Sequence, residues 1–288
     1  MVTSSFDYYA PTSVADALAL LDQHGDDAKL LAGGHSLIPL MKTRLAEPAV
    51  LIDLGKISTL SYINEQDGGL AIGAMTTYSE IAGSELVQSN APVLADASGQ
   101  VADNQIRNRG TIGGSLSHSD PAGDLPAVAL ALGAQLTTSS SGAHRTISAD
   151  DFFVDLLTTA LEPNEILSEI VIPALPAGTG TAYAKFANKA SHYAVVGVAA
   201  VVTVGSDGTC QSARIGITGA GPKATRATGT ESALVGLNLD DSAVRVAASH
   251  AGDGIDFNED VHASGEYRAH LISVYAARAI RAAVENAS

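Results

Sequence analysis

Two short glycine-rich segments are the residues of this sequence best suited to binding a ligand. The first segment comprises Ala32, Gly33, Gly34, His35 and Ser36, and the second comprises Thr111, Ile112, Gly113, Gly114 and Ser115. Paired glycines allow backbone N–H groups to point into one concavity, because glycine tolerates positive φ and permits close approach. One Gly-Gly pair indicates only a tight turn. Two similar segments predict two loops that hold one ligand carrying a diphosphate.

The charge of the chain limits how it can hold a phosphate group. Its 288 residues include 16 basic and 31 acidic side chains, for a formal net charge of −15. Such a chain repels nucleic acid and anionic lipid, so nucleic acid is not an expected partner. A bound phosphate must then be held by backbone amides and helix ends, which agrees with the two glycine segments.

Cysteine and histidine usage argues against a metal centre within this chain. Cys210 is the single cysteine, which excludes an internal disulfide, an iron–sulfur cluster and a cysteine zinc site. The eight histidines show no metal-ligand spacing. The N-terminus lacks a signal-peptide pattern and no apolar run reaches membrane-spanning length, so we expect a soluble, cytoplasmic protein.

Hydrophobic spacing and cap residues predict the elements that position the first glycine segment. A helix is expected between Ser13 and Gly25, a strand at 28–31, a short helix at 37–43 and a strand at 49–54. These elements form a small β-α-β-like unit in which the first segment joins a strand to a helix.

The middle of the chain combines strand and helix patterns around the second glycine segment. A hairpin is predicted over 60–73, and strands over 135–138, 145–147 and 165–172. Helices are predicted at 78–81, 92–101 and 125–132.

The pattern changes after a linker-like stretch at 173–180. Three long strands are predicted at 181–188, 195–204 and 209–219, as an antiparallel meander, followed by helices near 226–236, 241–251 and 265–285. We therefore expect three units: residues 1–56, 57–176 and 177–288.

Neither the Gly-x-Gly-x-x-Gly dinucleotide signature nor a Walker loop occurs, which disfavours a doubly wound nucleotide-binding fold. Instead, the segments LLAGGHSLIPLMKTRLAEPAVLIDL, QIRNRGTIGGSLSHSDPAGDLPAV and KFANKASHYAVVGVAAVV resemble the flavoprotein (medium) subunits of the molybdenum hydroxylase family. This family includes aerobic carbon monoxide dehydrogenase and xanthine dehydrogenase. The resemblance implies an α+β fold and non-covalent FAD. Two α/β subdomains of the PCMH-type FAD-binding fold would precede a C-terminal domain of three-stranded antiparallel sheet plus three helices.

The resemblance also assigns cofactor contacts to both glycine segments. Ala32–Ser36 and Thr111–Ser115 are expected to bind the pyrophosphate of FAD through backbone amides.

Five further residues are implied by the same resemblance. Asp124 matches an acid that contacts the ribityl or diphosphate region, and Val101 matches a position packed near the flavin or adenine. Ile166 or Leu167 is expected at the adenine side. Tyr193 is expected against the isoalloxazine ring, and a buried aromatic residue at a strand start is its alternative interpretation.

The resemblance implies an electron-transfer role within a complex. A large molybdopterin-binding subunit would oxidise the substrate, and a small subunit with two [2Fe-2S] clusters would pass electrons to the flavin. The assembly would be a dimer of heterotrimers. No general acid–base pair is apparent in this chain, so no catalytic residue is assigned. A stand-alone FAD-dependent oxidase or reductase and a non-catalytic nucleotide-binding protein are the alternatives.

Overall fold

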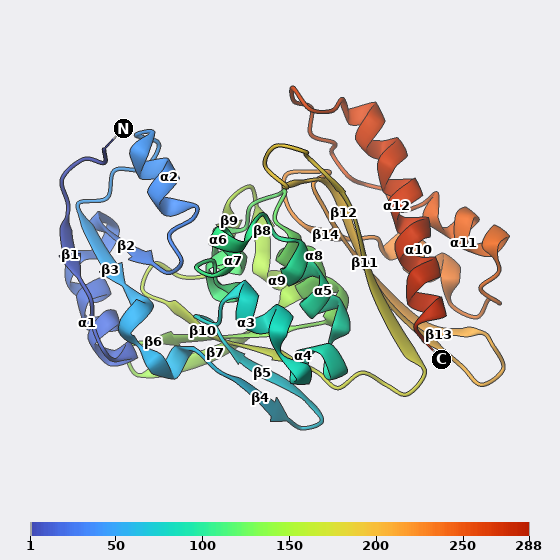
Figure 1. Cartoon of the computed structure of the whole chain (residues 1–288), viewed down its shortest axis with the longest axis horizontal. Helices are drawn as coiled ribbons and strands as arrows, with labels where there is room; N and C mark the ends of the chain where they lie inside the picture. The colour runs from blue at the N-terminus through green and yellow to red at the C-terminus, as the bar shows by residue number, and fades with distance from the viewer. Residues whose placement is uncertain (1, 288) are drawn as a thin grey trace.

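The structure, a computed structural model, describes residues 2–287, which form three main β-sheets surrounded by helices (Figure 1). Each main sheet is associated with its own cluster of buried hydrophobic residues. Figure 1 shows the N-terminal unit at one end of the molecule, the second unit in the middle, and the C-terminal sheet and helices at the other end.

The N-terminal unit is a three-stranded parallel sheet with two helices. Its elements are β1 (Asp7–Tyr9), α1 (Val14–His24), β2 (Ala28–Leu31), α2 (Leu37–Lys42) and β3 (Val50–Asp53), with sheet order β1-β3-β2 and 3₁₀ turns at Gly25–Asp27, Leu54–Lys56 and Ser58–Leu60. The Ser13 side chain caps α1 by accepting a hydrogen bond from the amide of Asp16. This arrangement confirms that the first glycine segment joins a strand to a helix.

The middle unit is built on an antiparallel five-stranded sheet of order β4-β5-β10-β6-β7. Its strands are β4 (Ile63–Gln66), β5 (Gly69–Gly73), β6 (Gln135–Ser140), β7 (Ala143–Ser148) and β10 (Ile166–Ile172). Its helices are α3 (Tyr78–Gly83), α4 (Glu85–Asn90), α5 (Pro92–Gln100), α6 (Asn104–Arg107), α7 (Ile112–His118), α8 (Asp124–Leu132) and α9 (Ala149–Phe152). A small hairpin of β8 (Phe153–Asp155) and β9 (Thr158–Thr159) follows α9.

The central strand β10 links two hydrophobic cores. Ile170 and Ile172 pack into the core of the middle unit. Ile166, at the start of the same strand, packs into the N-terminal core with Leu18 and Ile52. The two units are therefore joined by shared packing as well as by the chain.

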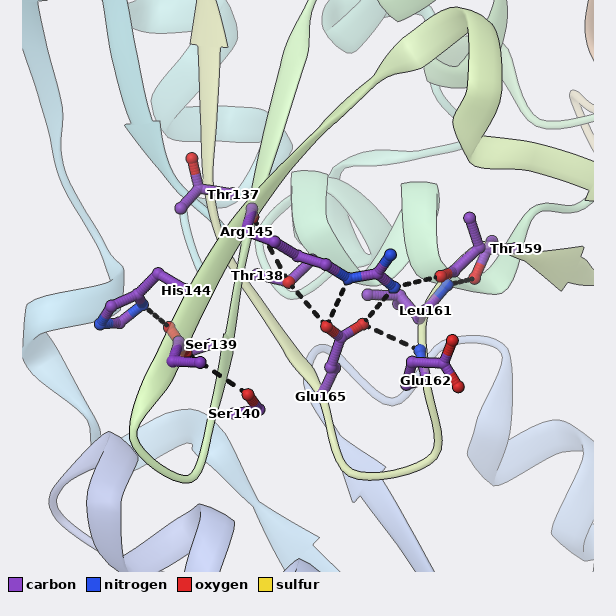
Figure 2. A network of polar contacts seen from close by, with 12 residues as sticks. Thr137, Thr138, Ser139, Ser140, His144, Arg145, Thr159, Leu161, Glu162 and Glu165 are labelled. Atoms are coloured by element: carbon purple, nitrogen blue, oxygen red, sulfur yellow. Dashed lines mark hydrogen bonds and ion pairs between the residues drawn. The ribbon is translucent and has the colours of Figure 1, made fainter.

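A polar network fixes the β6–β7 hairpin against the loop before β10 (Figure 2). The Glu165 carboxylate accepts hydrogen bonds from Arg145 Nε at 2.6 Å and Nη2 at 2.7 Å, from the Thr138 hydroxyl at 3.1 Å, and from the amide of Glu162 at 2.8 Å. Arg145 Nη2 also donates to the carbonyl oxygen of Ala160 at 2.6 Å. The hydrogen bonds from Arg145 are the main reason why the pKa of Glu165 lies below its ordinary value.

The C-terminal sheet is covered by helices on both faces. It contains β11 (Thr179–Ala187), β12 (Ala194–Val204), β13 (Cys210–Thr218) and β14 (Thr225–Arg226), and is followed by α10 (Thr228–Leu234), α11 (Asp241–Ala248) and α12 (Gly265–Glu285). Along β12, Val198 and Ala200 face the core that includes α12, whereas Ala199 and Val201 face the core of the middle unit. Because successive strand side chains point to opposite faces, α12 and the middle-unit helices α5 and α8 cover different sides.

The α+β fold expected from the sequence is confirmed, and the differences concern short elements. The two-residue strand β14 pairs with β13 and makes the C-terminal sheet four-stranded. Strand β1 and helices α4 and α6 were not predicted, since elements of three to six residues carry too little periodicity to detect. The segment 111–115 was expected to be a loop, but it caps and begins α7.

Among residues 2–287, no helix is both long enough and apolar enough to cross a membrane. The same residues contain no group of three or more His, Cys, Asp or Glu side chains arranged to hold a metal ion.

Candidate cofactor site

The first glycine segment supplies unpaired backbone donors. It connects β2 to α2, and Gly34 lies in the left-handed region with φ of +79°, which favours glycine. Within the described residues 2–287, no protein acceptor is found for the amides of residues 33–36. Four consecutive N–H groups without protein acceptors are available to donate to a bound anion.

The backbone amides of residues 112–115 in the second glycine segment have acceptors within the protein. The amides of Ile112 and Gly113 donate to the carbonyl oxygens of Thr76 at 3.0 Å and Ala74 at 2.8 Å. The amides of Gly114 and Ser115 donate to Thr111, to its side chain at 3.1 Å and its carbonyl oxygen at 3.0 Å respectively. These four amides donate within the protein, and the contact of the segment with a pyrophosphate stays a prediction.

Close packing explains the glycine in the second segment. A Cβ atom added to Gly113 would lie 2.5 Å from the Cβ atom of Ala74 and 2.6 Å from its carbonyl oxygen. Neither Gly113 nor Gly114 has positive φ. The absence of a side chain, rather than left-handed backbone, is what this position requires.

The structure brings the two glycine segments together. A Cβ atom on Gly33 would lie 2.2 Å from the carbonyl oxygen of Arg109, two residues before Thr111. A Cβ atom on Gly114 would lie 3.4 Å from the Cβ atom of Ala32. The two predicted segments are therefore in direct contact with each other, as binding of one ligand by both requires.

Asp124 lies at the start of α8 and is buried in an ion pair. Its Oδ2 atom is 2.9 Å from Lys185 Nζ, and its Oδ1 atom accepts a short hydrogen bond from the Tyr183 hydroxyl. Burial raises the pKa of Asp124, and Lys185 and Tyr183 oppose that rise. Burial, together with Asp124, raises the pKa of Tyr183 well above its ordinary value. Lys185 also donates to the carbonyl oxygen of Gln100 at 3.2 Å, which connects Asp124 to the end of α5.

Tyr193 stands at the edge of this region. It is 45% exposed, in contrast to the buried aromatic residue that the alternative interpretation required. Partial burial, followed by the negative charges of Asp120 and Asp124, raises its pKa. Tyr193 also lines a cavity of about 360 Å³ with Asp120, Asn188 and Arg268.

The remaining predicted residues differ in how far their side chains are exposed to solvent. Val101 is half-buried at the C-terminal end of α5 and packs against the middle core. Ile166 and Leu167 are 1% and 5% exposed, so core packing leaves their side chains no face for a ligand. Any contact from these two residues would have to come from their backbone.

The structure adds three residues that the sequence did not single out. Lys185 and Tyr183 contact Asp124, although about 60 residues separate them from it in the sequence. Tyr78 packs against Gly110, and burial raises its pKa to about 12, an effect that the nearby Ser115 hydroxyl partly opposes. The one sequence feature that could have revealed Lys185 is its charge, because it is the single basic residue in the largely apolar strand β11.

The chemistry of this site fits FAD. Four unpaired amides suit a pyrophosphate in a chain whose net charge is −15, because they attract an anion without a basic patch. The glycines at 33 and 113 let neighbouring protein backbone pack closely against the two segments. The fold and the site thus suit a protein that binds a diphosphate-bearing cofactor such as FAD.

Comparison with known proteins agrees with this class. Residues 4–175 match the FAD binding domain in molybdopterin dehydrogenase, and residues 181–283 match the CO dehydrogenase flavoprotein C-terminal domain. The chain therefore belongs to the family of FAD-binding medium subunits of the molybdenum hydroxylases, in which carbon monoxide dehydrogenase is represented.

The similarity to individual proteins extends over the full length. The chain is 42% identical over 283 residues to the carbon monoxide dehydrogenase medium chain of Hydrogenophaga pseudoflava, covering 98% of both chains. It is 39% identical over 287 residues to the alpha subunit of the 6-hydroxypseudooxynicotine dehydrogenase complex of Paenarthrobacter nicotinovorans, covering 100% of this chain and 97% of that one. A solved structure of the Hydrogenophaga pseudoflava carbon monoxide dehydrogenase matches with a TM-score of 0.97 at 42% identity, covering 100% of both chains.

Proposed function

We propose that this chain is the electron-exit subunit of a molybdenum hydroxylase complex. It accepts electrons from [2Fe-2S] clusters on a partner subunit and passes them to an external acceptor. Bound FAD supplies the redox centre for this transfer. The residues of the chain bind the cofactor, orient it and control which molecules reach it.

The observation that carries the proposal is the set of unpaired amides at 33–36, directly against the segment 109–114. We assign the pyrophosphate of FAD to these amides. We assign the opposite side of the diphosphate to the backbone of Thr111–Ser115.

The buried pair of Asp124 and Lys185 is assigned to the same end of the cofactor site. Its ion pair fixes the N-terminal end of α8 relative to β11 and the end of α5. Val101, at that end of α5, is assigned to the flavin or adenine region. Tyr193 is assigned to the isoalloxazine ring because it is exposed and borders Asp120 and Asp124. Ile166 or Leu167 is assigned to the adenine side through backbone atoms.

The assigned partners are a large molybdopterin-binding subunit and a small subunit with two [2Fe-2S] clusters, in a cytoplasmic dimer of heterotrimers. A single, buried cysteine supports this assignment, because the iron–sulfur relay then needs thiolate ligands from another polypeptide. The full-length similarity to a medium chain and to a dehydrogenase complex subunit also supports it.

The test begins with the purified chain, which should be yellow and should release intact FAD on acid denaturation. Gly34→Val should lower the affinity for FAD by at least about 100-fold, because position 34 needs positive φ and a Cβ atom there would lie 3.2 Å from Ile38. Gly83→Val is the control, since a Cβ atom at Gly83 meets no atom within 4 Å.

Two outcomes would contradict the proposal. One is a chain that refuses FAD under all conditions. The other is a free monomer that retains FAD and oxidises an organic substrate without partner subunits, which would favour a stand-alone oxidase. Native mass spectrometry of material from the source organism distinguishes the free monomer from the complex.

A further inference from the structure

Arg268, on helix α12, is buried although it is charged. It is 4% exposed, and α12 lies along β11 and β12 (Figure 1). Its Nη1 atom donates to the carbonyl oxygens of Val195 at 2.6 Å and Gly219 at 2.5 Å. Its Nη2 atom donates to Asp260 Oδ2 at 2.7 Å. One guanidinium therefore joins the start of β12, the residue after β13 and the loop between α11 and α12.

The two carbonyl groups that Arg268 holds lie in segments packed directly against each other. Gly219 has φ of +82°, and a Cβ atom there would lie 2.6 Å from the carbonyl oxygen of Val195 and 2.7 Å from that of Ala194. Position 219 thus requires glycine both for its backbone conformation and for this close approach. The close approach brings both carbonyl oxygens within reach of one Nη1 atom.

The end of β13 also holds the loop that leads into α8, whose first residue is Asp124. The Gly219 amide donates to the carbonyl oxygen of Pro121 at 2.7 Å. The Thr218 hydroxyl donates to the carbonyl oxygens of Pro121 at 2.9 Å and Gly123 at 2.7 Å. The residues immediately before Asp124 are therefore fixed to the backbone that Arg268 anchors.

Tyr193 is connected to Arg268 along the chain and across a cavity. Tyr193 lies two residues before Val195, and its carbonyl oxygen accepts a hydrogen bond from the amide of Asn188 at 2.8 Å. Tyr193 and Arg268 both line the cavity of about 360 Å³. The other ionisable side chains that line this cavity are Asp120, Asp260 and His262. Fixing the start of β12 thus fixes the point from which the Tyr193 side chain projects.

The direction of the Tyr193 side chain depends on its backbone. Among the described residues, no hydrogen-bond partner is found for its hydroxyl group. His192, directly before it, has φ of +60°, a conformation that residues other than glycine rarely adopt. Such a conformation persists only where the surrounding structure holds it. An anchor close to this turn is therefore needed to keep Tyr193 in one place.

We propose that Arg268 is the positioning residue for Tyr193 at the flavin ring, acting through the carbonyl groups of Val195 and Gly219. This inference rests on the proposed function, in which Tyr193 contacts the isoalloxazine ring. The planar guanidinium suits this role, because its fixed fork directs N–H groups to two carbonyl oxygens and a carboxylate at once. A lysine ammonium is a point charge on a flexible stem and cannot reproduce this geometry.

The test measures the fluorescence of FAD bound to the full chain. A tyrosine in contact with a flavin quenches its emission by electron transfer, whereas a phenylalanine does not, so Tyr193→Phe gives the emission expected without this quenching. In Arg268→Lys, the emission should rise from the wild-type level toward that of Tyr193→Phe. In Arg268→Lys/Tyr193→Phe, it should equal that of Tyr193→Phe, because the two changes act through one contact.

Arg281→Lys is the matched control. Arg281 lies on the same helix and pairs with Asp241 on α11. Its Nε atom, like that of Arg268, is buried without a hydrogen-bond partner in the part of the chain that the structure describes. FAD emission should stay at the wild-type level in this variant, because Arg281 joins α12 to α11 rather than to the start of β12.

A second variant keeps Arg268 in place. Asp260→Asn removes the carboxylate that pairs with Arg268 Nη2, while the asparagine Oδ1 atom can still accept hydrogen bonds from the amides of His262 and Ala263. FAD emission should rise in the same direction as in Arg268→Lys. This variant decides the question if Arg268→Lys fails to fold.

Wild-type emission in both Arg268→Lys and Asp260→Asn would overturn the proposal. An effect of Arg268→Lys that persists undiminished in the Tyr193→Phe background would overturn it too, because Arg268 would then act on the fold and not through Tyr193. Bound FAD whose emission is the same in wild type and Tyr193→Phe would refute the assignment of Tyr193 and this inference with it. A wild-type chain that binds no FAD would refute the proposed function itself.

Discussion

At the scale of single residues, the glycines of the site are required for two different reasons. Gly34 adopts a backbone conformation that other residues rarely take, while Gly33 and Gly113 have a neighbouring backbone where a side chain would be. The sequence predicts that both glycine segments depend on glycine, but it cannot separate the two reasons, because close approach depends on Arg109 and Ala74.

Substitution of Gly33 should separate cofactor binding from folding of the rest of the chain. In Gly33→Ala, the new Cβ atom would lie 2.2 Å from the carbonyl oxygen of Arg109, so the two glycine segments must move apart. We expect FAD affinity to fall at least about 100-fold while far-UV circular dichroism stays close to wild type. Fluorescence titration with FAD measures the affinity. Gly83→Ala should bind as wild type.

The pair of Lys185 and Asp124 gives a second prediction. Lys185→Met leaves a buried carboxylate without its charge partner, which should lower the free energy of unfolding at pH 8 by about 3–5 kcal/mol. The pKa of Asp124 is already raised by burial and should rise further without Lys185. The folded variant then binds a proton more readily than the unfolded chain, so its stability deficit should shrink as the pH falls from 8 toward 5.

Thermal unfolding of the Lys185→Met variant across this pH range provides the measurement. The double variant Asp124→Asn/Lys185→Met should recover much of the lost stability, because it removes the buried charge. A deficit that stays constant with pH would show that Asp124 is not the titrating group.

At the scale of elements, the network in Figure 2 makes the β6–β7 hairpin sensitive to acid. The lowered pKa of Glu165 means that the folded chain holds its proton less tightly than the unfolded chain. At pH values above the pKa of Glu165 in the unfolded chain, near 4.5, this carboxylate stabilises the fold. The stabilisation is lost as the pH falls through the lower pKa of Glu165 in the folded chain.

Glu165→Gln should lower the melting temperature at pH 7 by roughly 2–4 °C and should weaken the acid-dependent loss of stability. Differential scanning calorimetry from pH 7 to pH 3 measures both effects. Ser140→Ala, on the same hairpin but outside the Arg145–Glu165 pair, is the control and should retain the wild-type pH profile.

The predictability of the elements follows their length. Helix α12 and strands β12 and β13 have enough residues for periodicity to be read, and the sequence placed them within a few residues. The sequence predicts a loop at the start of α7, because Gly113 and Gly114 are poor helix formers. Their presence outweighed the helix-start signal of Thr111, whose side chain caps α7 in the structure. The partners of Asp124 depend on tertiary structure and no local pattern reveals them.

At the scale of the whole molecule, the C-terminal unit completes the middle one. Tyr183, Ala199 and Val201 belong to the middle core, and Lys185 pairs with Asp124. A fragment of residues 1–175 should therefore expose the faces of α5 and α8, aggregate, and bind FAD at least about 10-fold more weakly than the full chain. Size-exclusion chromatography and FAD titration measure this outcome. A monodisperse fragment with full affinity would show that the two units fold independently.

The sharing of Ile166 between two units has a consequence during synthesis on the ribosome. The N-terminal core includes this residue, which emerges about 110 residues after Leu54. At about 5–20 residues per second, the first unit waits on the order of ten seconds for its last core side chain. Nascent chains stalled before Ile166 should therefore be cleaved by protease within residues 1–60, and chains stalled well beyond it should be protected. The N-terminal end of this protein is made first, but it should become resistant only after most of the middle unit has been made.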